Sequence, residues 1–254
     1  MRFILGAVSI FTAGLAAVAC VSPALLAASP AGSLGRLSYA VEWRLIHAGD
    51  VVIESKDSGA TARIESAGLV STLFKIDNTY TAHFGPAYCA TDSLLDSKEG
   101  KRHHQTSVTY EHNPNRAVLL ERDLIKNEIM KSATIETPPC VHDVLGGMLA
   151  LRGLTLEPGQ SMLSPVSDGR RAAQVKVEAE EREEITTPAG KFKTTRYEIN
   201  IMNGVVYMRK GRVFVWLTDD NDRLPVQILL RLAFPIGSVT LQLEKPAPSK
   251  EDSK

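Results

Sequence analysis

Residues 37–45 read Leu-Ser-Tyr-Ala-Val-Glu-Trp-Arg-Leu, and this stretch decides the fold. Its odd-numbered positions carry large apolar side chains, whereas its even-numbered positions carry small or polar ones. Because successive side chains of a β-strand point to opposite faces, this alternation predicts a strand with one buried face. Ala48-Gly49-Asp50 is a turn signal, and we expect the chain to return there as a second strand over 51–54.

Similar extended segments recur on both sides of a break at Pro138-Pro139. Turn signals separate these segments at short intervals, and Asn203-Gly204 is a strong hairpin signal. The series predicts a mainly β fold, either a large curved antiparallel sheet or a barrel-like meander. The expected strands are 60–67, 72–84, 86–96, 101–112, 117–121, 124–135, 175–184, 192–201, 213–217, 225–234 and 238–243.

One short helix is predicted near 142–152, where apolar residues fall at helical spacing. Asp143 is placed to cap its first turn, and Arg152 lies near the negative end of its dipole. Gly146-Gly147 lower the helix propensity, so we expect them to allow close packing against a sheet or another backbone. A phosphate-binding loop would also need a suitably spaced lysine, which the segment lacks.

The N-terminus has the pattern of a secretory signal peptide. Arg2 precedes an apolar run, and no further charge occurs before Arg36. We expect 1–28 to be cleaved as a signal peptide and the protein to reside in the periplasm or to be secreted. The alternative is a lipoprotein-like box at 17–20, in which Cys20 would carry an outer-membrane lipid anchor.

The rest of the chain is expected to form one domain. After a linker at 29–35, a single β-rich domain covers 36–245, and 138–155 would divide it if it consists of two β halves. The polar tail at 246–254 is expected to be disordered.

Three cysteines are present, and export leaves Cys89 and Cys140 as a pair. In an oxidising compartment such a pair is expected to form a disulfide. Two buried free thiols are an alternative. A catalytic pair of Cys140 with the neighbouring His142 would need an orienting partner, and the sequence shows none.

The chain carries 29 basic and 29 acidic residues, so its formal net charge is zero. Such a balance gives no electrostatic reason to bind nucleic acid or an anionic membrane. Beyond the leader, no segment is long and apolar enough to predict a transmembrane span in the mature chain.

No catalytic, cofactor-binding or metal-binding residues are predicted. His103-His104 lie on a predicted strand, where neighbouring side chains point to opposite faces and cannot easily share one metal. Asp219–Asp222 lacks the glycine and distal glutamate of a calcium loop, so it is interpreted as an acidic turn with Arg223 paired to one carboxylate. Asp143 and Arg152 are interpreted as structural residues of the helix.

Four stretches resemble the bacterial domain of unknown function 3108 family and together cover about residues 36–245. The first is 37–43 followed by Ala48-Gly49, and the second is 141–144 leading to 149–152. The others are 187–194 and 215–220, the latter accompanied by 223–226 and 237–240. The resemblance implies an exported β-rich protein, and it implies no activity, cofactor or catalytic residue.

The expected function is that of a cell-envelope protein, a non-catalytic binding or structural module for a lipid, glycan or protein partner. A curved sheet could present a concave apolar surface to such a partner, and a sizeable open apolar cavity would support this hypothesis. The alternative is an envelope hydrolase acting on glycan or peptide through carboxylates or His142, which requires polar groups that converge in one cleft.

Overall fold

The computed structural model describes residues 33–200, 211–232 and 237–245. The predicted signal peptide at 1–28, Cys20, the Asn203-Gly204 hairpin and the tail at 246–254 lie outside these residues. Within them, neither helix is long and apolar enough to cross a lipid bilayer.

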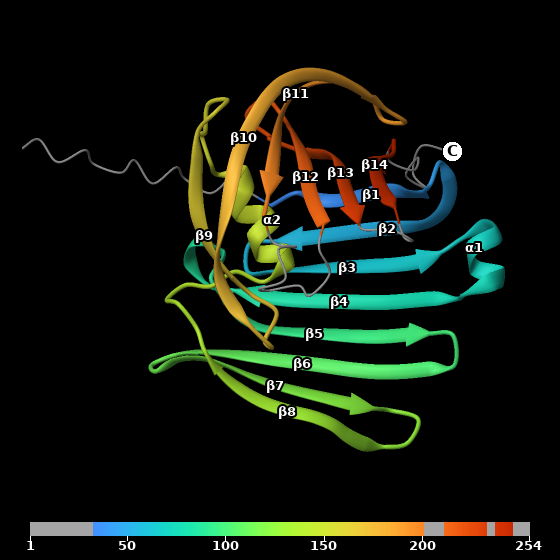
Figure 1. Ribbon diagram of the computed structural model, residues 1–254, viewed down its shortest axis with the longest axis vertical. Coiled ribbons are helices and arrows are strands. Elements are labelled where there is room, and N and C mark those ends of the chain that lie inside the picture. The colour runs from blue at the N-terminus through green and yellow to red at the C-terminus, as the bar shows by residue number, and fades with distance from the viewer. Residues whose placement is uncertain (1–32, 201–210, 233–236, 246–254) are drawn as a thin grey trace, which may run out of the picture.

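The described residues form a single antiparallel sheet of 14 strands, which confirms the predicted mainly β fold (Figure 1). Its first part contains β1 (Gly35–Trp43), β2 (Ile46–Lys56), β3 (Gly59–Ser66), β4 (Ile76–Phe84), β5 (Ala90–Glu99), β6 (Arg102–His112), β7 (Asn115–Asp123) and β8 (Glu128–Glu136). The second contains β9 (Ser161–Ser167), β10 (Ala172–Thr187), β11 (Gly190–Ile199), β12 (Gly211–Thr218), β13 (Pro225–Leu232) and β14 (Ser238–Leu243). The helical elements are α1 (Gly68–Leu73), the 3₁₀ turn η1 (Pro86–Tyr88) and α2 (Val144–Arg152).

The sheet consists of two meanders joined through their ends. Strands β1–β8 pair in chain order, strands β9–β14 do the same, and β14 pairs with β1. The two sheet edges, β8 and β9, are therefore consecutive in the chain, and a direct pairing between them would close a barrel. Residues 137–160, which include α2, instead connect these edges, and the sheet remains an open, strongly curved band around the helix (Figure 1).

The segment before α2 ties the two meanders together. The Ala90 amide, at the start of β5, donates to the Val141 carbonyl at 2.8 Å. The next residue, His142, donates its amide to Pro165 of β9 at 2.9 Å and accepts from the Ser167 amide at 3.0 Å. These main-chain bonds satisfy part of the β9 edge and fix α2 inside the curve.

Register shifts help the sheet to curve. A register shift, or β-bulge, bends a strand and increases its twist. Such shifts occur in five strand pairs: β1–β2, β4–β5, β7–β8, β10–β11 and β12–β13. In the largest core cluster of the described residues, Leu145 and Leu149 of α2 are grouped with Tyr39 of β1 and Ile53 of β2.

Several strand boundaries differ from the prediction. The first hairpin turns at Arg44-Leu45, not at Ala48-Gly49-Asp50, which lies inside β2. Gly49 is needed there because a Cβ at this position would lie 2.3 Å from the Glu65 carbonyl oxygen of β3. The strand expected over 72–84 begins only at Ile76, after α1, and the one expected over 86–96 begins at Ala90, after η1.

Strand β9 was not predicted at all. Its sequence, Ser-Met-Leu-Ser-Pro-Val-Ser, has no clear alternation and contains Pro165. Proline is tolerated at a sheet edge, where its missing amide removes no ladder bond, and β9 is such an edge.

Candidate functional site

Asp143 is the N-cap residue of α2. As predicted, its Oδ1 atom caps the helix by accepting from the Gly146 amide at 2.6 Å. A Cβ on Gly146 would lie 2.9 Å from the Tyr88 carbonyl oxygen, which confirms that the glycine permits close packing against another backbone. The helix therefore lies directly on η1.

The disulfide pair lies at the same end. Cys89 directly follows η1, Cys140 precedes Val141, and their Cα atoms lie 4.6 Å apart with the sulfurs at bonding distance. The predicted pairing of Cys89 with Cys140 therefore agrees with the structure, and the bond would clamp η1 to the segment that leads into α2.

The C-terminal end of α2 is held by Arg152, which is 3% exposed. Its Nη2 donates to the Asp222 carbonyl at 2.7 Å and its Nε donates to the Arg223 carbonyl at 3.3 Å. Arg152 thus anchors the helix to the turn between β12 and β13, and burial lowers its pKa.

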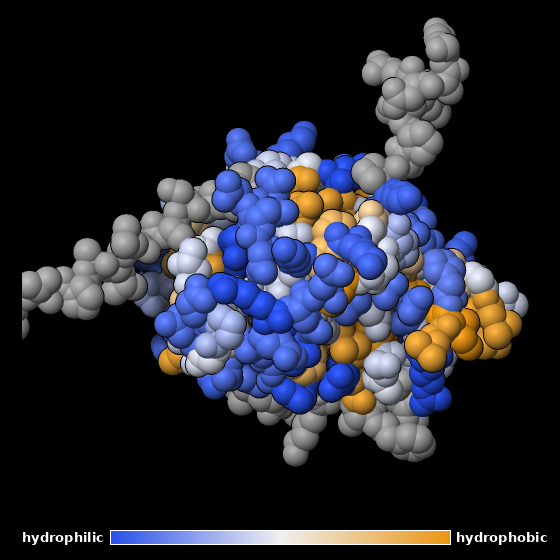
Figure 2. Space-filling model, turned by 90° about the horizontal axis from the view of Figure 1, so that it is seen from above, coloured by the Kyte–Doolittle hydropathy of each residue, from blue (hydrophilic) through white to orange (hydrophobic). Residues whose placement is uncertain are grey.

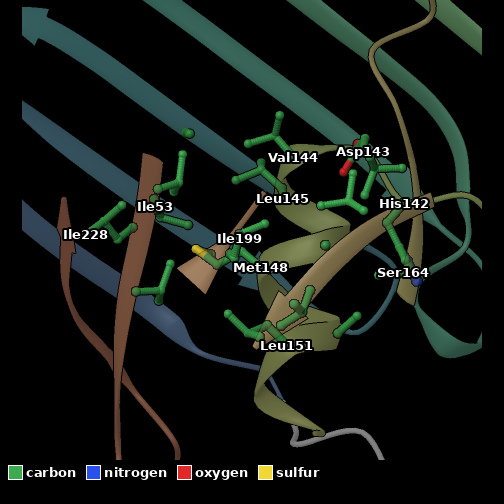
Figure 3. A pocket seen from close by; sticks show the side chains of 18 of the residues that line it. Ile53, His142, Asp143, Val144, Leu145, Met148, Leu151, Ser164, Ile199 and Ile228 are labelled. Carbon is green, nitrogen blue, oxygen red and sulfur yellow. The ribbon is translucent and has the colours of Figure 1, made fainter. Parts of the chain in front are cut away.

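A cavity of about 540 Å³ lies between α2 and the concave face of the sheet (Figure 3). We call it the α2 cavity. Its walls come from both meanders and are almost entirely aliphatic. They consist of Val51, Ile53, Ala62 and Ile64 of β2 and β3, of Val144, Leu145, Gly147, Met148, Ala150 and Leu151 of α2 with Leu154 after it, and of Met162, Pro165, Val166, Val175, Val177, Ile199, Val213, Val215, Ile228, Leu230 and Leu241 of β9–β14.

Polar lining residues gather near the start of α2. They are His142, Asp143 and Ser164, and Figure 3 shows them on the side of the cavity away from Ile53 and Ile228. The carboxylate of Asp143 accepts from the Tyr80 hydroxyl at 3.2 Å in addition to capping α2. Burial raises the pKa of Asp143 from 3.8 to about 6, even though these hydrogen bonds favour the charged form.

The His142 ring is neutral and has a defined tautomer. Its Nδ1 lies 3.0 Å from the Tyr88 carbonyl oxygen, and burial lowers its pKa. Because a carbonyl oxygen can only accept, Nδ1 must carry the proton, which makes Nε2 a hydrogen-bond acceptor. The cavity therefore offers a large apolar volume with an acceptor nitrogen and a carboxyl group near one end.

The other candidate residues do not belong to this site. His103 pairs with Asp96 at 3.0 Å, whereas His104 lies 3.8 Å from Asp123, so the two imidazoles have separate partners, as the strand pattern predicts. Within the described residues, no group of three or more His, Cys, Asp or Glu side chains is arranged to hold a metal ion.

The acidic run at 219–222 forms the predicted turn, because Asp220 Oδ1 accepts from the amides of Asp222 and Arg223 at 3.1 Å. The expected ion pair of Arg223 was wrong. Its guanidinium donates to the Tyr197 hydroxyl at 2.6 Å and lies over that ring, since the turn directs the side chain inward over β11.

Comparisons with known proteins identify a family and a fold. A family model described as a protein of unknown function, DUF3108, matches residues 38–244. The chain also resembles the crystal structure of a β-barrel-like DUF1849 protein from Brucella abortus, with a TM-score of 0.56 and 13% identity over 83% of this chain and 95% of that one. A Bacteroides fragilis protein with a YmcC-like fold matches over 85% of this chain and 96% of its own, at 10% identity and a TM-score of 0.30. No curated protein matches.

Proposed function

The chain belongs to the DUF3108 family, and we propose that it is an exported cell-envelope protein that binds a lipid acyl chain in the α2 cavity. The observation that carries the proposal is the cavity itself. Its volume of about 540 Å³ lies in the range of small-molecule pockets, and its lining is almost wholly aliphatic.

The aliphatic lining of the cavity favours a lipid over the glycan and protein partners that the sequence also allows. A glycan or a peptide backbone brings many hydroxyl or amide groups, and each one costs free energy when buried without a hydrogen-bond partner. Among the described residues, polar side chains line the cavity at three positions, His142, Asp143 and Ser164. An acyl chain has no such groups and gains about 0.8 kcal/mol for each methylene that leaves water.

The polar residues indicate where a lipid's head would lie. With Nε2 of His142 as an acceptor, the ligand must supply a donor, such as the hydroxyl of a glyceride or of a protonated fatty acid. Asp143, whose pKa is raised to about 6, adds little charge below that pH and repels an ionised carboxylate above it. A neutral hydroxyl-bearing lipid is therefore the preferred ligand at neutral pH.

Export is part of the proposal. It is supported by the signal-like leader at 1–28 and by the Cys89–Cys140 pair, because disulfides persist in oxidising compartments. The finer assignments, to the periplasm or to an outer-membrane lipoprotein anchored at Cys20, are part of the same proposal.

The hydrolase alternative is not proposed, because its candidate groups do not converge. His142 and Asp143 lie at the start of α2, whereas the run at 219–222 contacts Arg152 at its other end. A helix of nine residues is about 13 Å long, which is too far for the two groups to act on one bond.

Native mass spectrometry of the protein purified from its own envelope tests the proposal. We expect a co-purified mass that organic solvent removes and that belongs to a lipid. After its removal, the protein should bind a fluorescent long-chain fatty alcohol, and V213W, which fills the cavity, should weaken this binding at least tenfold.

The matched control is L163W, because Leu163 is 60% exposed and lies between two lining residues without lining the cavity itself. Equal binding by V213W and L163W, or a co-purified glycan or peptide in place of a lipid, would contradict the proposal.

A further inference from the structure

Exposed apolar side chains gather at the end of the sheet that carries α1. They are Leu45, which is 92% exposed, with Ile46, Leu69, Leu73 and Phe74. In Figure 2 a group of orange residues projects from the side of the molecule on which Figure 1 places α1. We call these five residues the apolar tip. Contiguous apolar surface of this kind is uncommon on a monomer unless it contacts a partner.

The five residues of the tip come from two neighbouring connections, the β1–β2 turn and the segment of α1, and the β5–β6 turn lies beside α1. The Ala67 amide before α1 donates to Ala48 of β2 at 2.9 Å, which joins α1 to the first hairpin. On the other side the Gly100 amide donates to the Lys75 carbonyl at 2.8 Å. The Phe74 ring lies over this β5–β6 turn, 3.4 Å from the position of a Cβ on Gly100.

The turn of the first hairpin has two unusual features, the residue types at its central positions and an exposed leucine. Arg44 and Leu45 have φ angles of 51° and 68°, in the left-handed region that two-residue turns usually fill with Asn-Gly. Leu45 also places an aliphatic side chain in water. The backbone conformation suits a two-residue hairpin, but Arg and Leu are unusual residues for it, and such local conflicts are expected where a surface has a function.

Cations without carboxylate partners border the tip. Lys75, Lys98, Lys101 and Arg102 are exposed, and among the described residues none of them lies within 4.0 Å of a carboxylate. Glu99, in the same turn, accepts instead from the Asn78 amide at 3.0 Å.

Some other exposed arginines of the sheet form ion pairs, whereas Arg122 of β7 is exposed and forms none with a described carboxylate. Arg63 contacts Glu65, Arg182 contacts Glu157 and Arg212 contacts Glu198. The tip combines apolar side chains with four exposed cations that form no ion pair within 4.0 Å among the described residues, although Asp77 and Glu99 lie opposite Lys98 and Arg102 in the strand register.

We propose that the apolar tip docks on an anionic lipid surface. Its aliphatic and aromatic side chains would enter the interface, while the bordering lysines and arginine contact phosphate groups. Net charge, which is zero for the chain, averages over the whole surface and does not describe the arrangement of charges at the tip. The proposal concerns a second surface and does not depend on whether the α2 cavity is occupied.

The strand register connects the two regions. Trp43, the last residue before the turn, pairs with Val239, and Val239 pairs with Leu230. Leu230 in turn pairs with Val213, and both of these residues line the α2 cavity. Val213 and Leu230 of the cavity wall thus lie in the same cross-strand row as Trp43, which is next to the tip. A membrane bound to the tip would therefore lie close to the cavity.

Vesicle co-sedimentation tests the proposal, with C20A as the parent so that no lipid anchor contributes. We expect binding to phosphatidylcholine vesicles that contain phosphatidylglycerol, and much weaker binding to phosphatidylcholine alone. K101E/R102E should weaken binding at least thirtyfold, since the loss of each cation near an anionic surface costs about fivefold and the new carboxylates add repulsion. L69N/L73N should abolish it, and added salt should weaken it.

Two matched controls keep the test specific. L163N places the same substitution at another exposed leucine, and K191E/K193E reverses two exposed lysines on β11. Both should bind like the parent, and thermal unfolding should show that all variants remain folded.

The proposal is overturned if the parent binds both vesicles equally, binds neither at low salt, or keeps its affinity in the tip variants. If L69N/L73N instead converts a dimer to a monomer, the tip is an interface between two copies. Crosslinks from the tip to an envelope protein, without vesicle binding, would assign it to a protein partner.

Discussion

The two ends of α2 place ionisable groups in the interior in opposite ways. At the Asp143 end the carboxyl borders the α2 cavity, and burial shifts its pKa towards the neutral form. At the Arg152 end the guanidinium stays away from the cavity and is held by two carbonyl oxygens. Full charge is therefore kept at the end of α2 that lies away from the cavity, whereas the carboxyl at the cavity end can become neutral.

Removal of the Cys89–Cys140 disulfide is expected to cause the largest loss of stability and to act on the Asp143 end of α2. C89S/C140S opens a loop with a sequence separation of 51, which should lower the free energy of unfolding by about 4 kcal/mol. Urea unfolding measures this loss.

Hydrogen exchange shows where the loss is located. The amides of Ala90 and His142, which tie the Asp143 end to the sheet, should exchange faster, whereas those near Arg152 should change little. Equal loosening of both ends would show that the disulfide does not serve the cavity end in particular.

The pH dependence of D143N should give the next largest effect. Because the pKa of Asp143 is raised in the folded state, its favourable contribution is present at pH 4 and is lost as the pH rises through about 6. The shift from 3.8 to about 6 corresponds to about 3 kcal/mol. Asparagine can still cap α2 but cannot ionise.

Urea unfolding at pH 4 and pH 7 therefore distinguishes the two proteins. Between these pH values, D143N should gain about 2.5 kcal/mol of stability relative to the wild type, because at pH 4 the carboxyl is already partly ionised in the unfolded chain. D96N, which alters an aspartate paired with His103, is the control, and parallel pH profiles for D143N and wild type would refute the assignment.

R152M should give the smallest of the three effects. It leaves the carbonyls of Asp222 and Arg223 without their donor, at a cost of about 2 kcal/mol in unfolding free energy. The matched variant R170M removes an exposed pair with Glu121 and should cost less than about 1 kcal/mol. If both variants lose the same stability, Arg152 does not anchor this end of the helix.

Much of the fold follows from local chemistry. The alternation at 37–45 predicts β1, and the aspartate before an apolar helical pattern predicts the cap of α2. The first turn was misplaced because Arg44-Leu45 lacks the Asn-Gly chemistry of its backbone conformation, whereas Gly49, which resembles a turn residue, serves strand contact. Local sequence reports which residues favour a turn, and tertiary contacts decide which of them form one.

The α2 cavity could not be predicted in this way. It is the volume that remains between side chains such as Ile53 of β2 and Val213 of β12, which are far apart in the chain. Alternation predicts that both face inward, but not whether they touch. The sequence assigns Asp143 to the cap of α2 and names His142 only in the hydrolase alternative, so it does not predict that both residues line the cavity.

The most direct test of the account is photo-crosslinking with a fatty alcohol that carries a diazirine at the end of its chain. We predict crosslinks to residues that line the α2 cavity, such as Met148, Val213 and Ile228, and their loss when unlabelled alcohol competes. Crosslinks confined to the apolar tip, or none that competitor removes, would contradict the claim that the cavity holds an acyl chain.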